Sequence, residues 1–487
     1  MKSQYIIVLG LLVWSLTPQL LQAQNEVDAL RYSFQGTPGS ARSLGMGGAF
    51  GALGADPSSF WNNPGGLGMY KRNAFELSFK YNDRTTSSSF LGNDEDANDV
   101  GTRIQNLAMI TTRRSNKDER FQVTFGFGIG NLNTYDERIR IEGTNSTSTL
   151  MDVFAFQAQG TPRDIIYDQF PFSAGLAYDT YLIDPLDTIA HTYIPAENAN
   201  RTSQTKVIDR SGRHNEMTFG FGFNFDEKWS GGISLGIQTA FFRETSSYTE
   251  KFPESDYIVG YTFNEDINAG GSGVVARIGG IYRASEWLRV GAGWQSPVRL
   301  NIDDAYSTSI NSSFVDGSTF ASFSPELSSN FSVRVPGKLM VNSAFILGKS
   351  GVIATDYEYT DFSNIQMRSE GLSSDYSYEE ENETIRNIYT VSHKVKVGME
   401  WRLIEWLRLR AGASYQTSPF EDGVAQSDPI LNYTGGIGFR KGKFYLDLAG
   451  SYQAGSESYW LYNPALVDET RIDTELISGI ITFGFRY

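Results

Sequence analysis

Apolar and polar residues alternate along most of this chain. Between Met217 and Phe225 every second residue is phenylalanine, and glycine or asparagine separates the later ones. Because side chains alternate across a strand, the phenylalanines share one face and the small residues share the other. The last stretch follows the same pattern, with one face made by Ile477, Gly479, Ile481, Phe483, Phe485 and Tyr487. The pattern predicts strands with one apolar face and one face of small or polar residues.

Fourteen such strands can be counted after residue 73. We predict them near residues 74–84, 101–114, 120–141, 213–226, 229–249, 271–283, 287–304, 331–347, 351–366, 388–403, 406–418, 429–440, 443–456 and 475–487. Phe170–Leu182 and Thr202–Arg210 either add two more strands or fold within a large loop.

The connections between these strands are alternately short and long. Short ones lie at 115–119, 226–228, 284–286, 348–350, 404–405 and 441–443, and long ones near 84–100, 142–212, 250–271, 305–330, 368–386, 418–429 and 457–474. Trp229, Trp287 and Trp406 each follow a short turn. Tight turns on one side, long loops on the other and an aromatic girdle are typical of a transmembrane antiparallel β-barrel of about fourteen strands. A soluble β-sandwich has no reason to sort its loops in this way.

Composition narrows the choice further. Residues 1–23 have the charged start, apolar stretch and small-residue end of a signal peptide, which predicts export. After them no stretch approaches the roughly 18 apolar residues of a membrane helix, so the mature chain is either soluble or a closed barrel. The absence of cysteine excludes disulfides and thiolate metal sites, and a net charge of -15 disfavours nucleic acid as a partner.

Residues 24–72 differ from the rest because they are glycine-rich and poorly periodic. Small residues let backbone pack closely on backbone, as a plug inside a narrow barrel must. The glycines at 126, 128, 130, 220 and 222 are candidate wall positions that make room for such a plug. Asp56 is placed to cap a short helix that starts at Pro57, and the turn at Asn63-Pro64 ends it.

The opening of this segment resembles a known family. Residues 40–50 read Ser-Ala-Arg-Ser-Leu-Gly-Met-Gly-Gly-Ala-Phe, and Asp-Pro-Ser-Ser and Asn-Pro-Gly-Gly-Leu follow at 56–59 and 63–67. This is similar to the start of FadL/TodX-like outer-membrane transporters of long-chain fatty acids and other hydrophobic compounds. The family usually has Ala where this chain has Gly65. The hatch motif carried over from the resemblance comprises Gly45, Met46, Gly47, Gly48, Asn63, Pro64 and Leu67.

The resemblance implies a fourteen-stranded barrel in the outer membrane, formed by residues 73–487 with long extracellular loops. Residues 24–72 would be an N-terminal hatch that fills the lumen. In the family, a ligand enters from outside, binds in apolar pockets and leaves sideways where a strand is kinked. The glycine-bearing strands 121–130 and 217–226 are candidates for the kinked strand, unless their glycines only relieve crowding.

Charged residues on the small-residue faces are candidate lumen groups: Arg289, Lys396, Glu400, Arg408 and Arg410. The cations would either meet a ligand carboxylate or, as we expect, pair with carboxylates such as Glu400 and Asp447 or with the hatch, because unpaired charge is costly away from water.

The function implied is passive uptake of fatty acids or aromatic hydrocarbons by a hatch-gated, laterally opening channel. The alternative is a non-transporting barrel that binds or assists secreted proteins, since such components share a similar opening. The expected surroundings are outer-membrane lipid and lipopolysaccharide, and we expect a monomer with a hydrophobic small-molecule ligand.

An enzyme is not expected. Gly232 to Gly236 matches the spacing around a nucleophilic serine, Ser234, but lies inside a strand rather than at a strand-to-helix turn. Asp94, Asp96 and Asn98 lack the glycine and glutamate of a calcium loop, and the three histidines lack ligand spacing, so neither a cofactor nor a metal is predicted.

Overall fold

The structure, a computed structural model, describes residues 26–487 except 117, 188, 371–375, 422 and 425–427. The signal peptide predicted at 1–23 lies outside the described residues. No helix in the described part is long and apolar enough to cross a membrane.

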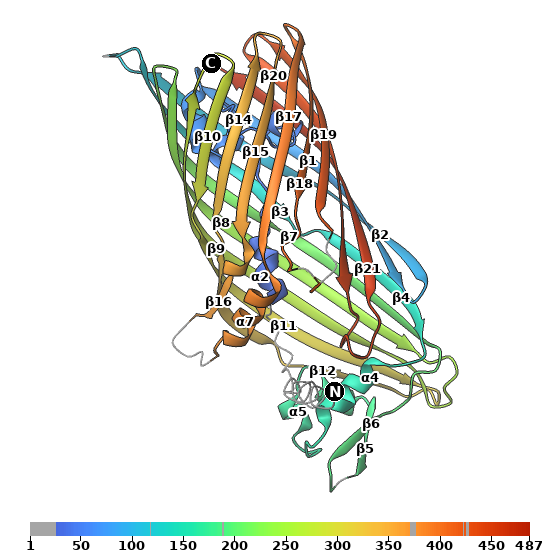
Figure 1. Cartoon of the computed structure of the whole chain (residues 1–487). Helices are drawn as coiled ribbons and strands as arrows, with labels where there is room; N and C mark the ends of the chain where they lie inside the picture. The colour runs from blue at the N-terminus through green and yellow to red at the C-terminus, as the bar shows by residue number, and fades with distance from the viewer. Residues whose placement is uncertain (1–25, 117, 188, 371–375, 422, 425–427) are drawn as a thin grey trace, which may run out of the picture.

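Antiparallel strands form a closed barrel with fourteen wall positions, as predicted (Figure 1). Neighbours in sequence are neighbours in the wall, and β21 closes the barrel on β1, with Arg486 opposite Ala74. Four positions hold two consecutive segments because the strand is interrupted. In chain order the wall consists of β1 (Ala74–Phe90), β2 (Asn93–Arg114), β3 with β4 (Phe121–Thr134, Glu137–Asn145), β7 (Thr202–Phe225), β8 (Trp229–Lys251), β9 (Ile258–Arg283), β10 with β11 (Leu288–Gln295, Val298–Phe314), β13 with β14 (Leu327–Val335, Lys338–Leu347), β15 with β16 (Gly351–Asp361, Gln366–Ser369), β17 (Val391–Ile404), β18 (Leu407–Gln416), β19 (Ile430–Lys441), β20 (Phe444–Tyr459) and β21 (Thr470–Arg486).

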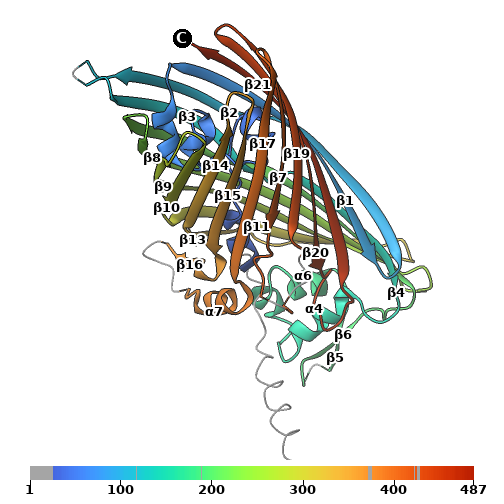
Figure 2. The ribbon, with the colours of Figure 1, turned by 45° about the horizontal axis from the view of Figure 1, so that its top comes forward.

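Short helices and strands occupy the barrel interior and the long connections. They are α2 (Glu26–Ser33), α3 (Ala41–Leu44), η1 (Pro57–Phe60), η2 (Pro64–Met69), α4 (Leu150–Ala158), α5 (Ile166–Gln169), α6 (Ala174–Asp179), β5 (Ile183–Asp187), β6 (Thr192–Pro195), β12 (Thr319–Phe323), η3 (Phe362–Asn364) and α7 (Glu379–Ile388). Helices α4 and α6 lie at the end of the barrel opposite the C-terminus (Figure 2). The short turns lie at the C-terminal end, so the end with the helices is the outer end.

The outer face of the wall carries an apolar belt. On β8 the residues exposed on this face run from Trp229, beside the short turn, through Leu235 to Phe241. The next residue on the same face is Arg243, which pairs with Asp266. Trp229, Trp287 and Trp406 are exposed at the turn end, as the girdle requires, and each packs on an aromatic residue of a neighbouring strand.

The strands continue outward well past this belt, which the sequence pattern did not reveal. The predicted loop at 84–100 is a regular hairpin of β1 and β2, and Thr202–Arg210 forms the first part of β7 rather than an additional strand. The other open segment, 170–182, contains α6 and no strand. Beyond the lipid, polar residues such as Ser, Thr and Asn face water on the outer side, so the apolar alternation disappears while the backbone pairing persists.

A helical cap closes much of the outer end. Residues of α4 and α6 pack with the inner faces of β4, β7, β8, β9 and β11 in one apolar core. The carboxylate of Glu250 is fully buried in this core. It accepts hydrogen bonds from the hydroxyls of Tyr248 (2.6 Å) and Tyr261 (2.8 Å) and from the backbone N–H of Leu150, the first residue of α4 (3.0 Å).

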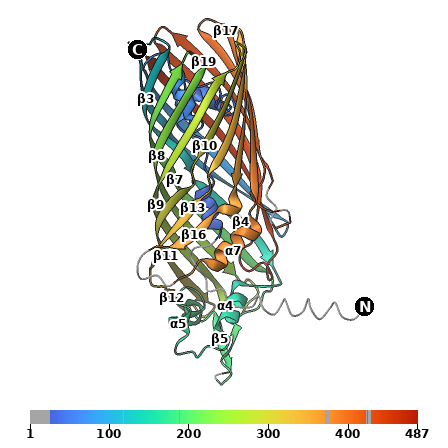
Figure 3. The same cartoon turned by 60° about the vertical axis from the view of Figure 1, so that its left-hand side comes forward.

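The N-terminal segment, residues 26–73, lies against the inner faces of the wall (Figure 3). Its outermost helix, α2, contacts β13 and α7, and its 3-10 helix η2 contacts β7, β8 and β9. Asp56 caps η1 at the backbone of Ser58, as predicted. The turn at Asn63 does not simply end that helix but caps a second one, η2, because the Asn63 side chain accepts from the N–H of Gly65.

Candidate functional site

Glycines of the N-terminal segment face glycines of the wall. A Cβ atom at Gly398 of β17 would lie 2.1 Å from the carbonyl oxygen of Met46, and one at Gly412 of β18 would lie 2.3 Å from the nitrogen of Gly47. Met46 is fully buried, and Gly47 has a positive φ of 66°. Only residues without a side chain allow two backbones to approach this closely.

The other two glycines of this motif also contact the wall. A Cβ at Gly45 would lie 3.3 Å from the Cα of Gly436 on β19. Gly48 has a φ of 77°, and its hypothetical Cβ would lie 3.6 Å from the Lys396 side chain. All four residues of the first half of the motif are therefore in contact with three consecutive strands, β17, β18 and β19.

The second half of the motif is fixed by the Asn63 side chain. Its amide nitrogen donates to the carbonyl oxygens of Gly51 (3.0 Å) and Gly280 (3.2 Å) and to Asn342 (3.2 Å). One asparagine thus links two turns of the N-terminal segment to two strands of the wall. Pro64 follows as the first residue of η2.

The wall glycines singled out in the sequence make room for this segment. Leu67 is fully buried, and a Cβ at Gly220 or Gly222 would collide with it. A Cβ at Gly126 would lie 2.4 Å from the ring of Phe60, which is a collision, and one at Gly128 would lie 3.1 Å from it, which is a tight contact. The expectation that these glycines accommodate the N-terminal segment is confirmed.

A wall carboxylate that sequence reasoning missed binds the backbone of the segment. Asp356 of β15 accepts from the N–H groups of Phe50 and Gly51, both at 2.9 Å, and from the Asn62 amide at 3.2 Å. Adjacent N–H groups that point the same way form an anion-binding turn. The sequence contained one signal for this contact: Asp356 falls at an inward-facing position of a predicted strand.

The predicted lumen charges form an ion-pair chain that begins on the N-terminal segment. Arg42 of α3 donates to both oxygens of Glu400, each at 2.9 Å. Glu400 also pairs with Arg410 at 2.7 Å, and Arg410 lies 2.8 Å from Asp447. The predicted pairing of Arg410 with Glu400 and Asp447 is confirmed, and bidentate contacts of this kind are geometrically specific.

The remaining lumen candidates have different partners. Lys396 pairs with Glu358, and Arg289 donates to the carbonyl oxygen of Leu53 at 3.1 Å. Arg408 has a buried guanidinium nitrogen without a hydrogen-bond partner among the described residues. Arg289 and Arg410 also have unpartnered nitrogens but each has a partner at another atom, so of the five candidates only Arg408 lacks the expected pairing within the described residues.

A luminal apolar cluster surrounds α2. We use this name for Ala29 and Tyr32 of α2 together with the buried residues that pack around them, which are Tyr135, Ala240, Phe242, Ala269, Val275, Val298, Leu300, Ile302, Phe331, Val333, Val335, Phe362, Ile365, Met367, Tyr378, Ile385 and Tyr389. Tyr32 meets Tyr135 edge-on, and the Arg31 guanidinium lies 4.0 Å from the centre of the Phe242 ring. Helix α2 thus buries Ala29 and Tyr32 in this cluster.

Lysines border this cluster just beyond the end of α2. Lys338 donates to the carbonyl oxygen of Gln35 at 3.1 Å. Lys394 is directly opposite Glu358 in the sheet, but Glu358 forms its ion pair with Lys396. A small cavity of about 20 Å³ lies between Lys338, Lys394 and Glu358 and touches Phe362 of the cluster. Lys394 and Lys338 lie on strands far apart in the sequence, which gives no local reason to group them.

The backbone hydrogen-bond ladder of the wall is interrupted along one seam, which side-chain contacts bridge. Pairing between β2 and β3 ends at Asn106 opposite Gly130, and from there outward β4 pairs only with β7 in the described part of the chain. The β3 register is irregular between Asn131 and Asn133, just past the glycines at 126–130. Both kink candidates, 121–130 and 217–226, therefore run in unbroken register, and the irregularity of β3 lies just beyond the first of them.

The N-terminal segment contacts this irregularity directly. The N–H of Gly36 donates to the carbonyl oxygen of Leu132 at 2.9 Å, and the Asn133 amide donates to the carbonyl oxygen of Phe34 at 3.1 Å. Both segment residues follow α2 immediately. The position of α2 and the conformation of the broken strand are therefore linked by two hydrogen bonds.

Residues considered for catalysis have structural contacts here. The Ser234 hydroxyl donates to the carbonyl oxygen of Phe60 at 2.8 Å inside β8, with no strand-to-helix turn. His214 is buried in the lumen and His393 bonds Tyr357 on the outer face. Among the described residues no group of three or more His, Cys, Asp or Glu side chains is arranged to hold a metal ion.

Comparison with known proteins agrees with this geometry. Residues 214–459, about half of the chain, match the family model described as outer membrane protein transport protein (OMPP1/FadL/TodX). No curated protein matches by sequence. Among solved structures, the P. putida toluene transporter TodX is similar over 93% of this chain and 99% of its own, with 12% identity and a TM-score of 0.54.

Two further structures share the fold. A Pseudomonas aeruginosa FadL homologue covers 93% of this chain and 98% of its own, with 13% identity and a TM-score of 0.54. The Ralstonia pickettii toluene transporter TbuX covers 94% and 100%, with 12% identity and a TM-score of 0.51. Together with the family match, the closed fourteen-stranded wall shows that this chain is an outer-membrane barrel that belongs to the OMPP1/FadL/TodX family of transport proteins.

Proposed function

We propose that the protein is a passive outer-membrane channel for hydrophobic compounds that carry a carboxylate, and that long-chain fatty acids fit it best. The observation that carries this proposal is the pair Lys338 and Lys394, which line a small cavity at the border of the luminal apolar cluster. Its two nearby carboxylates, Glu358 and Asp356, are engaged by Lys396 and by backbone N–H groups. An amphipathic acid would satisfy both surfaces, whereas an aromatic hydrocarbon would leave the ammonium groups without an anion.

In this proposal residues 26–73 act as the hatch and α2 is its moving part. The ligand tail would take the space that α2 fills in the apolar cluster. The ligand carboxylate would replace the Gln35 carbonyl as the partner of Lys338, because a charged acceptor makes a stronger hydrogen bond than a neutral one. The glycine motif and the Asn63 turn would remain in place as the anchor of the hatch.

The seam between β2 and β4 is the lateral exit in this proposal. Moving α2 would withdraw Phe34 and Gly36 from Asn133 and Leu132, which removes the two hydrogen bonds that hold the irregular part of β3 to the hatch. A hydrophobic molecule could then reach the membrane interior without crossing the polar headgroups. The ligand would have to displace the hydroxyls of Thr86 and Ser88, which reach from β1 to carbonyl oxygens of β4. It would also have to displace the ion pairs that Arg103 and Glu95 of β2 form with Asp136 and Arg140.

Uptake by reconstituted vesicles tests the proposal. In the K338M/K394M variant, loss of two charge-assisted hydrogen bonds is expected to raise the half-saturating concentration of a fluorescent fatty acid about tenfold or more. Flux of an uncharged aromatic hydrocarbon should be unchanged. The matched control is K80M, which removes another inward-facing lysine, on β1.

Two outcomes would contradict the proposal. One is equal fatty-acid uptake in wild type, K338M/K394M and a variant lacking residues 26–35. The other is stable co-purification with a secreted protein and no saturable uptake, which would favour the alternative role in assisting secreted proteins.

A further inference from the structure

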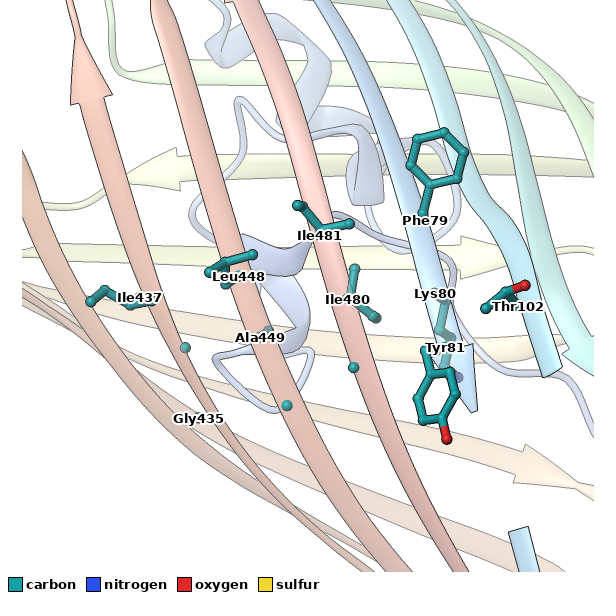
Figure 4. Close-up of a pocket in the computed structure, with 13 residues that line it drawn as sticks. Phe79, Lys80, Tyr81, Thr102, Gly435, Ile437, Leu448, Ala449, Ile480 and Ile481 are labelled. Carbon is teal, nitrogen blue, oxygen red and sulfur yellow. The ribbon is translucent and has the colours of Figure 1, made fainter. Parts of the chain in front are cut away.

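A groove on the lipid-facing side of the wall is independent of the lumen site. It has a volume of about 610 Å³ and crosses β19, β20, β21, β1 and β2. Its rims carry apolar side chains such as Ile437, Leu448, Ile481 and Phe79, and Figure 4 shows these residues on neighbouring strands.

The floor of the groove is a row of residues without side chains. Gly435 is opposite Gly450, Gly450 is opposite Gly479, and Gly479 is opposite Tyr81. Hydrogen-bonded register therefore places three glycines side by side on three adjacent strands. The three glycines span roughly 10 Å at about 4.8 Å per strand, and beyond them the groove continues past the side chains of Tyr81 and Thr102.

These glycines face the membrane rather than the lumen. A Cβ at Gly479 would meet nothing within 4 Å, and the nearest atoms at Gly435 and Gly450 lie 3.9 and 3.8 Å away. The wall is backed from inside, because α3 packs on the inner faces of β19, β20 and β21. The groove is thus a dent in a closed wall and not a passage through it.

The row lies toward the outer edge of the apolar belt. On β21 this belt extends from Ile477 to Tyr487, and Gly479 is the second lipid-facing position from its outer end. The next outward position is Glu475, which accepts from the Tyr452 hydroxyl at 2.8 Å and marks the polar boundary. The groove therefore faces the acyl chains of the outer leaflet.

We propose that this groove is a binding site for a saturated acyl chain of an outer-leaflet glycolipid of the lipid A type. A groove one residue wide and several strands long fits an extended chain. The rim on one side is formed by Ile437, Leu448, Ile481 and Phe79. On the other side, exposed residues two positions outward from the glycines offer contacts: Tyr433, Tyr452 and Ile477. In lipid a site gains affinity from packing contacts, since membrane tails are as apolar as the protein surface. Because the groove faces the outer leaflet, and glycolipid is the lipid of that leaflet, we assign the acyl chain to a glycolipid.

A second copy of the chain is a poorer occupant. A two-fold contact would place the groove against itself, because each partner of such a contact presents the same patch. Two concave surfaces would leave a void, and a void forfeits dispersion contacts. The proposal rests on the location of the barrel in the outer membrane and not on what the lumen transports.

The test fills the groove without disturbing the fold. In the G450L/G479L variant two leucine side chains occupy the row, and removal of about ten carbon–carbon contacts should lower glycolipid retention about tenfold. Gly270, where a Cβ also meets nothing within 4 Å, supplies the matched control G270L on β9. Each protein is extracted from outer membranes in mild detergent, and retained lipids are counted by native mass spectrometry.

We expect about one lipid A-type molecule per wild-type and G270L barrel and its loss from G450L/G479L, with fatty-acid uptake unchanged in all three. Equal retention in G450L/G479L, phospholipid in place of glycolipid, or a wild-type dimer that dissociates in the variant would each overturn the proposal. If the double variant does not insert, G479L alone keeps the comparison, because that position is open on all sides.

Discussion

The two ends of the lumen are filled in different ways. Toward the periplasmic side, residues 36–70 lie on glycines of the wall, with backbone against backbone and charges paired from Arg42 to Asp447. Toward the outer side, α2 and the helical cap are held by side-chain packing, and the cap core buries a carboxylate, Glu250, that has no cation. The comparison indicates one half that is anchored by a chain of buried ion pairs, and another that is held mainly by side-chain packing, with a single longer ion pair of 3.9 Å from Arg31 of α2 to Glu244 of β8.

Breaking the anchor should give the largest effect. E400A leaves Arg42 and Arg410 buried without their shared carboxylate, which should cost about 3–5 kcal/mol of the free energy of unfolding. Denaturant unfolding in detergent, followed by tryptophan fluorescence, measures this loss. The control is E227A, which removes the exposed partner of Lys71 and should cost less than about 1 kcal/mol. Equal losses would mean that the lumen pairs are as weak as surface ones.

The cap should respond to pH through Glu250, which lies beyond the lipid belt on β8. Burial away from water raises its pKa from 4.5 to about 7, although hydrogen bonds from Tyr248 and Leu150 oppose the increase. The closed cap thus binds a proton more tightly than an open one. Closure should be most stable below about pH 4.5 and lose up to about 3 kcal/mol as pH rises through 7.

Hydrogen exchange of the α4 amides, corrected for the intrinsic effect of pH, measures cap opening. Protection should fall between pH 5 and 8 in wild type, and E250Q should remove this dependence because the amide does not titrate. A pH response that persists in E250Q would assign the effect to another group.

Overpacking the glycine contact should have a smaller effect on stability and a clearer one on gating. In G412V the new side chain would overlap Gly47, so the anchored half must shift, at a cost of about 1–3 kcal/mol. We expect raised ion conductance through single channels in planar bilayers, since the segment would no longer fill the lumen. G270V, with open space around it, should conduct as wild type does. Wild-type conductance in G412V would contradict this expectation, because it would mean that the N-terminal segment still blocks the lumen despite the larger side chain.

Much of the wall could be predicted from the chain itself. The period-two pattern at Phe219–Phe225 and Ile477–Tyr487 located strands, and the short turns with Trp229, Trp287 and Trp406 set their order and direction. The same pattern failed outside the lipid, where β1, β2 and β7 continue as polar strands. Apolar alternation reports contact with lipid, not hydrogen bonding, so it cannot show where a strand ends in water.

The residue types of the candidate site could be predicted, but the residues that contact one another could not. The motif residues Gly45–Gly48 and Asn63 were recognisable because close backbone approach and a capped turn need glycine and asparagine. Lys338 and Asp356 were missed, since an inward-facing charge acquires a role only from residues hundreds of positions away. The seam at Asn106 and Gly130 also had no signature, because a missing pair of strands leaves no mark on either one.

Local sequence by itself determined that this chain forms a fourteen-stranded barrel preceded by a segment of small residues, because strand period, turn length and glycine content act over a few residues at a time. Only the tertiary structure decided which wall glycine contacts Gly47, which carboxylate pairs with Arg42, and where three glycines line up on the lipid-facing side. Those outcomes depend on the register between strands and on closure of the cylinder, and a one-residue slip in either would change every such contact.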